Sequence, residues 1–247
     1  MMKKINDIVP IIKIKDLRKS FDDNHVLNGF SMALCEGENL VIMGRSGSGK
    51  SVMIKCLVGL MQPDHGDIEI MNKNINELDQ DELNSLRTEI GFLFQGSALY
   101  DSMTVRENLK FPLRRRIKDS DEAEKLVYEA LKSVGLTEAI DLMPSELSGG
   151  MQRRVALARA IILHPKIIIY DEPTTGLDPI TAKEIIELMR NIQKIYGASS
   201  LIITHDVDCA RVIANRMILL IDGINYAEGT FKEISSSKDK KIQAFFK

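Results

Sequence analysis

The chain is poor in the features that mark secreted, zinc-binding or membrane-spanning proteins. Its three cysteines, Cys35, Cys56 and Cys209, lie far apart and form no CxxC pair or other metal-ligand spacing. We therefore expect neither a disulfide framework nor a zinc site. No run reaches about 18 apolar residues, and the start, MMKKINDIVP, lacks the apolar stretch of a signal peptide. These absences predict a protein of the reducing cytosol that does not itself cross a membrane.

An excess of charge of one sign is also lacking. The 33 basic and 35 acidic side chains leave a net charge of −2, so bulk charge suggests neither nucleic acid nor an anionic membrane as a partner. Internal repeats are absent. With 247 residues, 44% of them apolar and 28% charged, we expect one large α/β domain or a core with a smaller inserted domain.

Strand and helix patterns alternate along most of the chain. Apolar runs predict strands at 11–16, 26–34, 39–44, 66–70, 90–94, 166–171, 200–204, 216–221 and 224–228. Helices are predicted after residue 50 as far as Gly59, from the capping residue Asp119 to Gly135, and from Asp178 to Gly197. The stretch from 104 to 163 is mainly helical. The pattern therefore predicts an α/β core interrupted by a helical subdomain.

The strongest local signal is a glycine-rich segment between a predicted strand and a predicted helix. Its residues match the pattern GxxxxGK[ST]: Gly44, Arg45, Ser46, Gly47, Ser48, Gly49, Lys50 and Ser51. The glycines allow backbone N–H groups to turn around the β- and γ-phosphates of a nucleotide, at a helix N-terminus that favours anions. Lys50 adds a positive charge and Ser51 offers a hydroxyl to Mg²⁺. A loop that only turned the chain would need neither residue.

Two carboxylates follow the predicted strand 166–171. Asp171 and Glu172 come at its carboxyl end, which is the edge of a parallel sheet where ligands bind. We expect Asp171 to hold Mg²⁺ through its water shell, and Glu172 to orient and deprotonate the attacking water. Taken alone, the pair could equally cap the next loop. The phosphate loop upstream favours the catalytic interpretation.

The run Leu147-Ser148-Gly149-Gly150-Met151-Gln152-Arg153-Arg154 resembles the LSGGQ signature of ATP-binding-cassette ATPases. Ser148 and the amides of Gly149 and Gly150 would open a helix and form a second anion-binding N-terminus. In that family the signature of one copy closes over the ATP held by the phosphate loop of the other. The single copy of each motif therefore implies a head-to-tail dimer.

The resemblance also implies a fold. It covers about Ile11 to Gly229 and implies a P-loop NTPase core, a mixed and mainly parallel sheet flanked by helices with an N-terminal antiparallel β part. We assign 11–247 to one nucleotide-binding domain. Within it, 1–89 and 164–230 form the core with its β subdomain, 90–163 the helical subdomain with the signature, and 231–247 a tail.

Four further positions match family motifs. The resemblance implies that Gln95 touches Mg²⁺ and the attacking water, that His205 contacts the γ-phosphate, and that Asp178 lies in a loop crossing the dimer interface while capping its own helix. Phe21 stands where the family has an aromatic side chain against adenine, although it could be an ordinary core phenylalanine. Three residues depart from the usual pattern of the family: Arg45, Met151 and Gly176. None of these departures removes a group that the chemistry needs.

Two longer segments suggest a branch of the family. FLFQGSALYDSMTVRENLKFPLR (92–114) and PSELSGGMQRRVALARAI (144–161) resemble the ATPases of Mla/Mce-type phospholipid transport systems. This implies a motor on the cytoplasmic side of the inner (plasma) membrane, bound to separate permease subunits. Candidate permease contacts are Ala98, Leu99, Tyr100 and Met103, which could equally cover the helical subdomain's own core.

Two alternatives remain open at this point. An ATPase of an importer for amino acids or other small solutes would share every catalytic motif. A soluble cassette protein acting on ribosomes or in DNA repair fits less well, because the chain has neither a second cassette nor a coiled-coil insert, and no basic run for nucleic acid.

The last residues are predicted to form a short helix with Ile242, Phe245 and Phe246 on one face, after the segment SSSKDKK. Such a tail could dock on the second copy, on a small accessory protein as in the Mla systems, or on its own domain.

Overall fold

The computed structural model describes residues 9–246, so residues 1–8 of the predicted core lie outside the described part. The chain forms two compact units. The first runs to Arg87 and resumes at Ser199, and the second is Thr88–Ala198. The boundaries of these two units differ from the predicted subdomain boundaries at about 90 and 163. The predicted subdomains stay a prediction.

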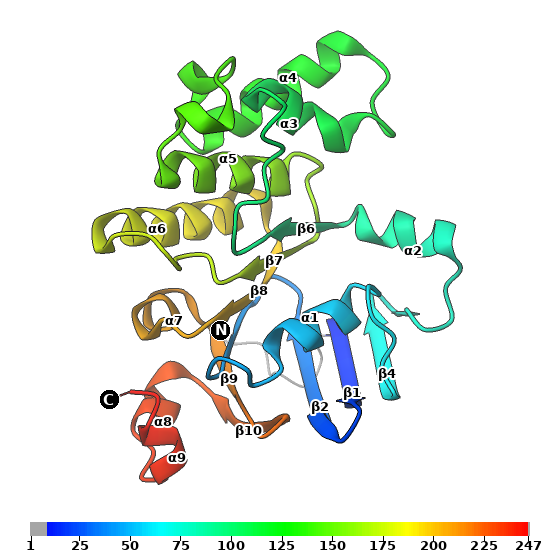
Figure 1. Ribbon diagram of the computed structural model, residues 1–247, viewed down its shortest axis with the longest axis vertical. Coiled ribbons are helices and arrows are strands. Elements are labelled where there is room, and N and C mark those ends of the chain that lie inside the picture. Colours follow the sequence, from blue (N-terminus) through cyan, green and yellow to red (C-terminus); the bar gives the residue numbers. More distant parts are fainter. Residues whose placement is uncertain (1–8, 247) are drawn as a thin grey trace. The chain divides into compact units, whose positions relative to one another are not determined.

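The first unit contains an antiparallel sheet of the order β2-β1-β4-β5 (Figure 1). Its strands are β1 (Pro10–Phe21), β2 (Asn24–Cys35), β4 (His65–Ile70) and β5 (Lys73–Asn74). Ile12 and Ile14 are buried whereas the lysines between and after them are exposed, as alternation along a strand requires. At Asp16, with φ 49°, a bulge shifts the register, so the next buried residue is Leu17.

A second set of strands in the same unit delivers residues to one edge. β3 (Asn39–Met43) is buried throughout and runs parallel to β8 (Ser199–Thr204) and β9 (Arg216–Ile221), and β10 (Ile224–Gly229) is antiparallel to β9. The register pairs Met43 with Thr204. The loop that begins at Gly44 and the residue His205 therefore leave the sheet next to each other.

Among its described residues, this unit also contains short helices: α1 (Lys50–Leu57), α2 (Gln80–Arg87), α7 (Val207–Ile213), α8 (Phe231–Ser235) and α9 (Lys240–Gln243). The sequence analysis missed α2, which buries only Leu83 and Leu86. The tail helix is shorter than predicted. Beyond Gln243 the backbone hydrogen bonds run from Phe245 N to Ile242 O and from Phe246 N to Gln243 O, so the two phenylalanines lie in a tighter turn after the helix and not within it.

The second unit holds a parallel pair of strands, β6 (Ile90–Leu93) and β7 (Ile167–Asp171). Their register runs from Ile90 opposite Ile167 to Leu93 opposite Tyr170. Because the strands are parallel and in step, the segment starting at Phe94 and the carboxylates that end β7 leave the pair at the same edge.

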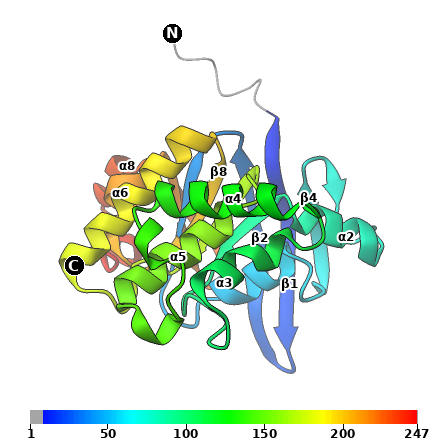
Figure 2. The same cartoon turned by 90° about the horizontal axis from the view of Figure 1, so that it is seen from above.

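The helices of the second unit are α3 (Val105–Leu113), α4 (Ser120–Ser133), α5 (Gly149–Ile161) and α6 (Pro179–Tyr196), with 3₁₀ turns at Thr137–Ala139 and Pro144–Glu146. The helices α3, α4 and α5 contact one another and are neighbours in both views (Figures 1 and 2). The predicted ends of two helices are confirmed: Asp119 and Asp178 accept hydrogen bonds from first-turn amides, and Gly135 and Gly197 follow with φ 68° and 64°. None of the helices among residues 9–246 combines the length and apolar character of a membrane span.

Candidate functional site

The loop between β3 and α1 folds tightly on itself. Gly47 and Gly49 have φ of 78° and 99°, values that L side chains rarely adopt. A Cβ on Gly44 would lie 2.4 Å from Ser48 Oγ and 2.9 Å from the carbonyl oxygen of Leu220, so only glycine fits there. The backbone path itself thus favours glycine at these three positions of the motif.

Lys50 is the first residue of α1 and only 8% exposed. Its Nζ donates to the carbonyl oxygens of Gly44 at 2.7 Å and Arg45 at 3.1 Å. The first turn of α1 contains no acidic residue, and Ser51 beside Lys50 is exposed. A buried ammonium at a helix N-terminus, wrapped by a glycine loop, suits a phosphate group.

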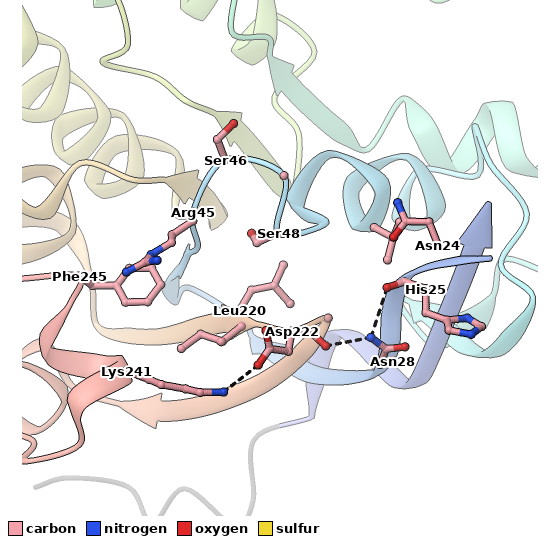
Figure 3. A pocket seen from close by; sticks show the side chains of 14 residues that line it. Asn24, His25, Asn28, Arg45, Ser46, Ser48, Leu220, Asp222, Lys241 and Phe245 are labelled. Carbon is pink, nitrogen blue, oxygen red and sulfur yellow. Dashed lines mark hydrogen bonds and ion pairs between the residues drawn. The ribbon is translucent and has the colours of Figure 1, made fainter. Parts of the chain in front are cut away.

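A cavity of about 560 Å³ borders this loop (Figure 3). Its walls are loop residues 45–48, the start of β2, the turn between β9 and β10, and Lys241 and Phe245 of the tail. The Arg45 guanidinium lies 5.8 Å from the Phe245 ring centroid, and Lys241 pairs with Asp222 at 2.9 Å. The tail therefore packs on its own unit, which was one of the three placements considered from the sequence.

Phe21 ends β1 and its side chain is 44% exposed. Lys19 Nζ lies 5.7 Å from the ring centroid and also pairs with Asp64 at 2.6 Å. An ordinary core phenylalanine would be buried, so the ring is available for stacking; the contact with adenine stays a prediction. His205 is exposed at the end of β8. The first unit thus contains the loop, Phe21 and His205.

In the second unit, Asp171 ends β7 and Glu172 directly follows it. Glu172 is 7% exposed and has φ 50°, which is unusual for a non-glycine residue. Thr175 Oγ1 donates to Glu172 Oε2 at 3.2 Å. A buried carboxylate on a strained backbone, held by a hydroxyl, is an arrangement found at functional sites.

Gln95 lies at the same edge, after β6, and is exposed. The residues that follow are strained, since Ser97 and Ala98 have φ of 59° and 50°. Among the candidate permease contacts, Ala98 and Tyr100 are exposed and Leu99 and Met103 are half-buried, so none belongs to the core. Further along, the Phe111 ring lies 4.8 Å from that of Tyr100, centroid to centroid.

The signature region forms a helix N-terminus as predicted. Ser148 caps α5 by accepting a hydrogen bond from Met151 N at 3.2 Å, and the first turn has no acidic residue. A Cβ on Gly150 would lie 2.7 Å from Thr181 Cγ2, near the start of α6. Asp178 caps α6, and its pKa is lowered chiefly by the Thr181 hydroxyl and then by backbone amides. The second unit thus contains the carboxylates, Gln95, the signature and Asp178.

Two arginines of α5 were missed by the sequence analysis. Arg153 and Arg159 are largely buried, and this burial lowers the pKa of both guanidinium groups. They donate to backbone carbonyl oxygens on either side of Gln95, Arg153 to Phe94 and Arg159 to Ser97. The helical periodicity could have indicated that Arg153 is buried. The residues three, four and seven positions later lie on the same face of the helix and are apolar and buried: Ala156, Leu157 and Ala160.

The sequence of the chain is similar to a known protein family and to several known proteins. The family model described as ABC transporter matches residues 27–175. The chain is 40% identical over 233 residues to a methionine import ATP-binding protein, MetN, of Brucella abortus, covering 94% of this chain and 63% of that protein. It is 38% identical over 258 residues to the chloroplastic protein TRIGALACTOSYLDIACYLGLYCEROL 3 of Arabidopsis thaliana, covering 97% and 74%. The chain thus spans about 63% of the length of the first curated relatives that it matches.

Solved structures show the same fold. The dimeric, ADP- and phosphate-bound ATP-binding cassette MJ0796 superposes with a TM-score of 0.81 at 35% identity, covering 89% of this chain and 98% of that one. The protein cbiO1 from Clostridium perfringens, part of the transporter complex cbiONQ, gives a TM-score of 0.86 at 32% identity over 93% and 92%. These structures confirm the predicted α/β phosphate-loop fold. The chain therefore belongs to the ABC transporter family, as one of its ATP-binding cassettes.

Proposed function

We propose that the chain is the ATP-hydrolysing subunit of an importer for a small solute of the amino-acid class, acting through a separate membrane permease. The phosphate loop carries the proposal, because its left-handed glycines and the buried ammonium of Lys50 suit the binding of an anion. The relatives described as methionine import ATP-binding proteins support the transport part. Since the chain spans only part of their length, the solute is assigned by class.

ATP is the substrate in this proposal. Lys50 and the loop amides would bind its β- and γ-phosphates, and Phe21 would stack on adenine. The donors Ser51, Gln95 and Asp171 are hydroxyl, amide and carboxylate oxygens, a set that suits Mg²⁺. When bound, Mg²⁺ supplies positive charge that offsets the charge developing on the phosphate oxygens.

Glu172 is the proposed general base. It accepts a proton from water while the water oxygen bonds to the γ-phosphorus and the bond to the β–γ bridging oxygen breaks, giving ADP and inorganic phosphate. The buried carboxylate and its hydrogen bond from Thr175 support this role, since both restrict its orientation. His205 would contact the γ-phosphate, and its place beside the loop in the sheet register supports that contact.

The working state is proposed to be a head-to-tail dimer with two ATP molecules. Each active site would take its phosphate loop from one copy, and from the other copy Ser148, Gly149, Gly150 and the Asp178 loop. The capped, acid-free N-terminus of α5 supports an anion contact there. Two of the similar solved cassettes are described as dimeric.

The permease is proposed to dock on the second unit, which would hold the chain at the cytoplasmic face of the plasma membrane. Exposed aromatic side chains flank Gln95 along the chain: Phe94 directly precedes it, and Tyr100 and Phe111, whose rings contact each other, follow it. Arg114 lies over Phe111 at 5.1 Å from the ring centroid. Such a mixed aromatic and cationic surface suits a partner helix. For an accessory protein on the tail the support is weaker, because Ile242 is buried on its own unit.

A second candidate is phospholipid transport of the Mla/Mce type. The resemblance of segments 92–114 and 144–161 favours it, and one relative is named for trigalactosyldiacylglycerol. The methionine import proteins favour the small-solute reading instead, with matches of 40% and 41% identity. We therefore place the lipid reading second, and a soluble cassette without a membrane partner third.

The test is affinity purification of tagged Glu172→Gln from its native membrane in the presence of ATP. This variant keeps the side-chain shape but loses the base, so the ATP-bound complex accumulates. A Lys50→Ala, Glu172→Gln double variant is the control, because it loses a phosphate ligand. A solute permease recovered only with the single variant supports the proposal. Mce-type companions with bound phospholipid would move the assignment to lipid transport, and absence of any membrane protein would contradict both.

A further inference from the structure

Arg153 is a buried cation that pairs with no carboxylate among residues 9–246. It lies on α5 and is 5% exposed. Its Nη1 donates to Phe94 O at 2.9 Å and its Nη2 to Thr175 O at 3.2 Å, while Nε has no partner in the described part of the chain. All of its hydrogen bonds therefore go to backbone carbonyl oxygens.

Such an arrangement is a poor way to stabilise a helix. Burying a guanidinium loses hydration, and neutral carbonyls return less than a carboxylate would. The same face of α5 is filled by Ala156, Leu157 and Ala160, so an apolar side chain at 153 would pack there without a buried charge. The cost of the cation points to a task other than packing.

The two carbonyls belong to the two segments that leave the β6–β7 edge. Phe94 directly precedes Gln95. Thr175 lies in the loop between Glu172 and Asp178, and its hydroxyl donates to the Glu172 carboxylate. One planar side chain thus joins the backbone of the Gln95 segment to the residue that orients Glu172.

Arg159 holds the other end of the Gln95 segment. Its Nη2 donates to Ser97 O at 3.1 Å, at the point where the backbone becomes left-handed. The segment 94–97 is therefore tied to α5 at both ends, and only Arg153 also reaches the Glu172 loop.

We infer that Arg153 is a positioning residue that couples the Gln95 segment to the Glu172 loop, so that displacement of one displaces the other. This inference rests on the proposed roles of Gln95 and Glu172. It assigns the coupling to the side chain at 153, a position that carries neither a nucleotide ligand nor a catalytic group.

The test compares full-length Arg153→Met and Arg153→Lys with Leu157→Ala. Leu157 is fully buried on the same helix and forms no hydrogen bond with its side chain to either loop. Its truncation should therefore destabilise the protein while leaving the hydrogen bonds of Arg153 intact. Amide hydrogen exchange is followed in peptides covering 94–98 and 173–177. We expect Arg153→Met to speed exchange in both segments together. Arg153→Lys, with one compact donor group, should speed exchange in only one of them.

Turnover gives the second readout, measured on the complex purified with its permease. Arg153→Met should lower kcat by about 10-fold or more and change the KM for ATP by less than about 3-fold, because it disturbs orientation rather than binding. The inference would be overturned if Leu157→Ala, at the same fall in Tm as Arg153→Met, showed the same changes in amide exchange and in turnover. Faster exchange in only one segment of Arg153→Met would also overturn it. A wild-type protein without ATPase activity would instead refute the proposed function, while the exchange comparison would still decide the coupling.

Discussion

Three glycines with similar backbone angles allow strain, crowding and ligand contact to be separated. Gly37 has φ 72°, Gly47 78° and Gly49 99°. Gly37 lies between β2 and β3, outside the phosphate loop, whereas the other two belong to it. A Cβ added at Gly37 or Gly47 would meet no atom within 4 Å. A Cβ added at Gly49 would lie 3.0 Å from Val26 O and 3.1 Å from a Leu27 methyl carbon.

The expected losses follow from these surroundings. A left-handed alanine costs about 1–2 kcal/mol, and reduced freedom of the unfolded chain offsets about 0.4–1 kcal/mol of it. Gly37→Ala and Gly47→Ala should therefore each lower the free energy of unfolding by about 1 kcal/mol. At Gly49 the steric clash of the added methyl group with Val26 and Leu27 should cost about 1–3 kcal/mol more. Gly49→Ala should then lose about 2–4 kcal/mol.

Urea unfolding measures these differences, and a fluorescent ATP analogue measures binding. Gly37→Ala should bind the analogue as the wild type does, whereas both loop variants should bind at least about 10-fold more weakly, because a methyl group there hinders phosphate approach to the amides. A Gly49→Ala variant no less stable than Gly37→Ala would refute the crowding. Weaker binding by Gly37→Ala would refute the assignment of the anion site to the loop.

Three other outcomes are expected. Glu172→Gln should bind ATP normally but turn over at least about 100-fold more slowly in a phosphate-release assay, and near-normal turnover would remove Glu172 as the base. Ser148→Arg should abolish ATP-dependent dimers in analytical ultracentrifugation while the nucleotide still binds; loss of binding as well would contradict a site shared between two copies. Hydrogen bonds from Lys110 and then Arg106 lower the pKa of Glu124, so its contribution to stability is present above the unfolded-state pKa and is lost as pH falls through the lower folded value. The destabilisation by Glu124→Gln, measured by urea unfolding, should accordingly be largest near neutral pH and vanish in strong acid.

Several elements could be predicted because residue types at short spacing specify them. Asp178 and Gly197 bound α6, since a carboxylate caps first-turn amides and glycine tolerates the left-handed exit. The phosphate loop is equally local, with Lys50 at the start of α1. The family followed from the same kind of information, motifs of fixed composition and order.

Other features depend on what packs against a segment. Phe21 could have been a core residue, and its exposure became evident only with β1 in place. The tail helix was predicted to include Phe245, yet its hydrogen bonds tighten after Gln243 and the ring packs on Arg45. The burial of Arg153 was not recognised until the packing of that face of α5 was known, although the apolar residues on the same helical face hinted at it.

The sequence by itself determined the cassette family, the phosphate loop, the signature helix and the capped ends of α4 and α6, because each is set by side chains within a few residues. Only the tertiary structure decided which distant groups share an edge. Parallel register brings Met43 beside Thr204 and Leu93 beside Tyr170, and it thereby aligns the loop with His205 and Gln95 with the carboxylates. Strand register is a property of paired segments far apart in the chain, so no local pattern could specify it.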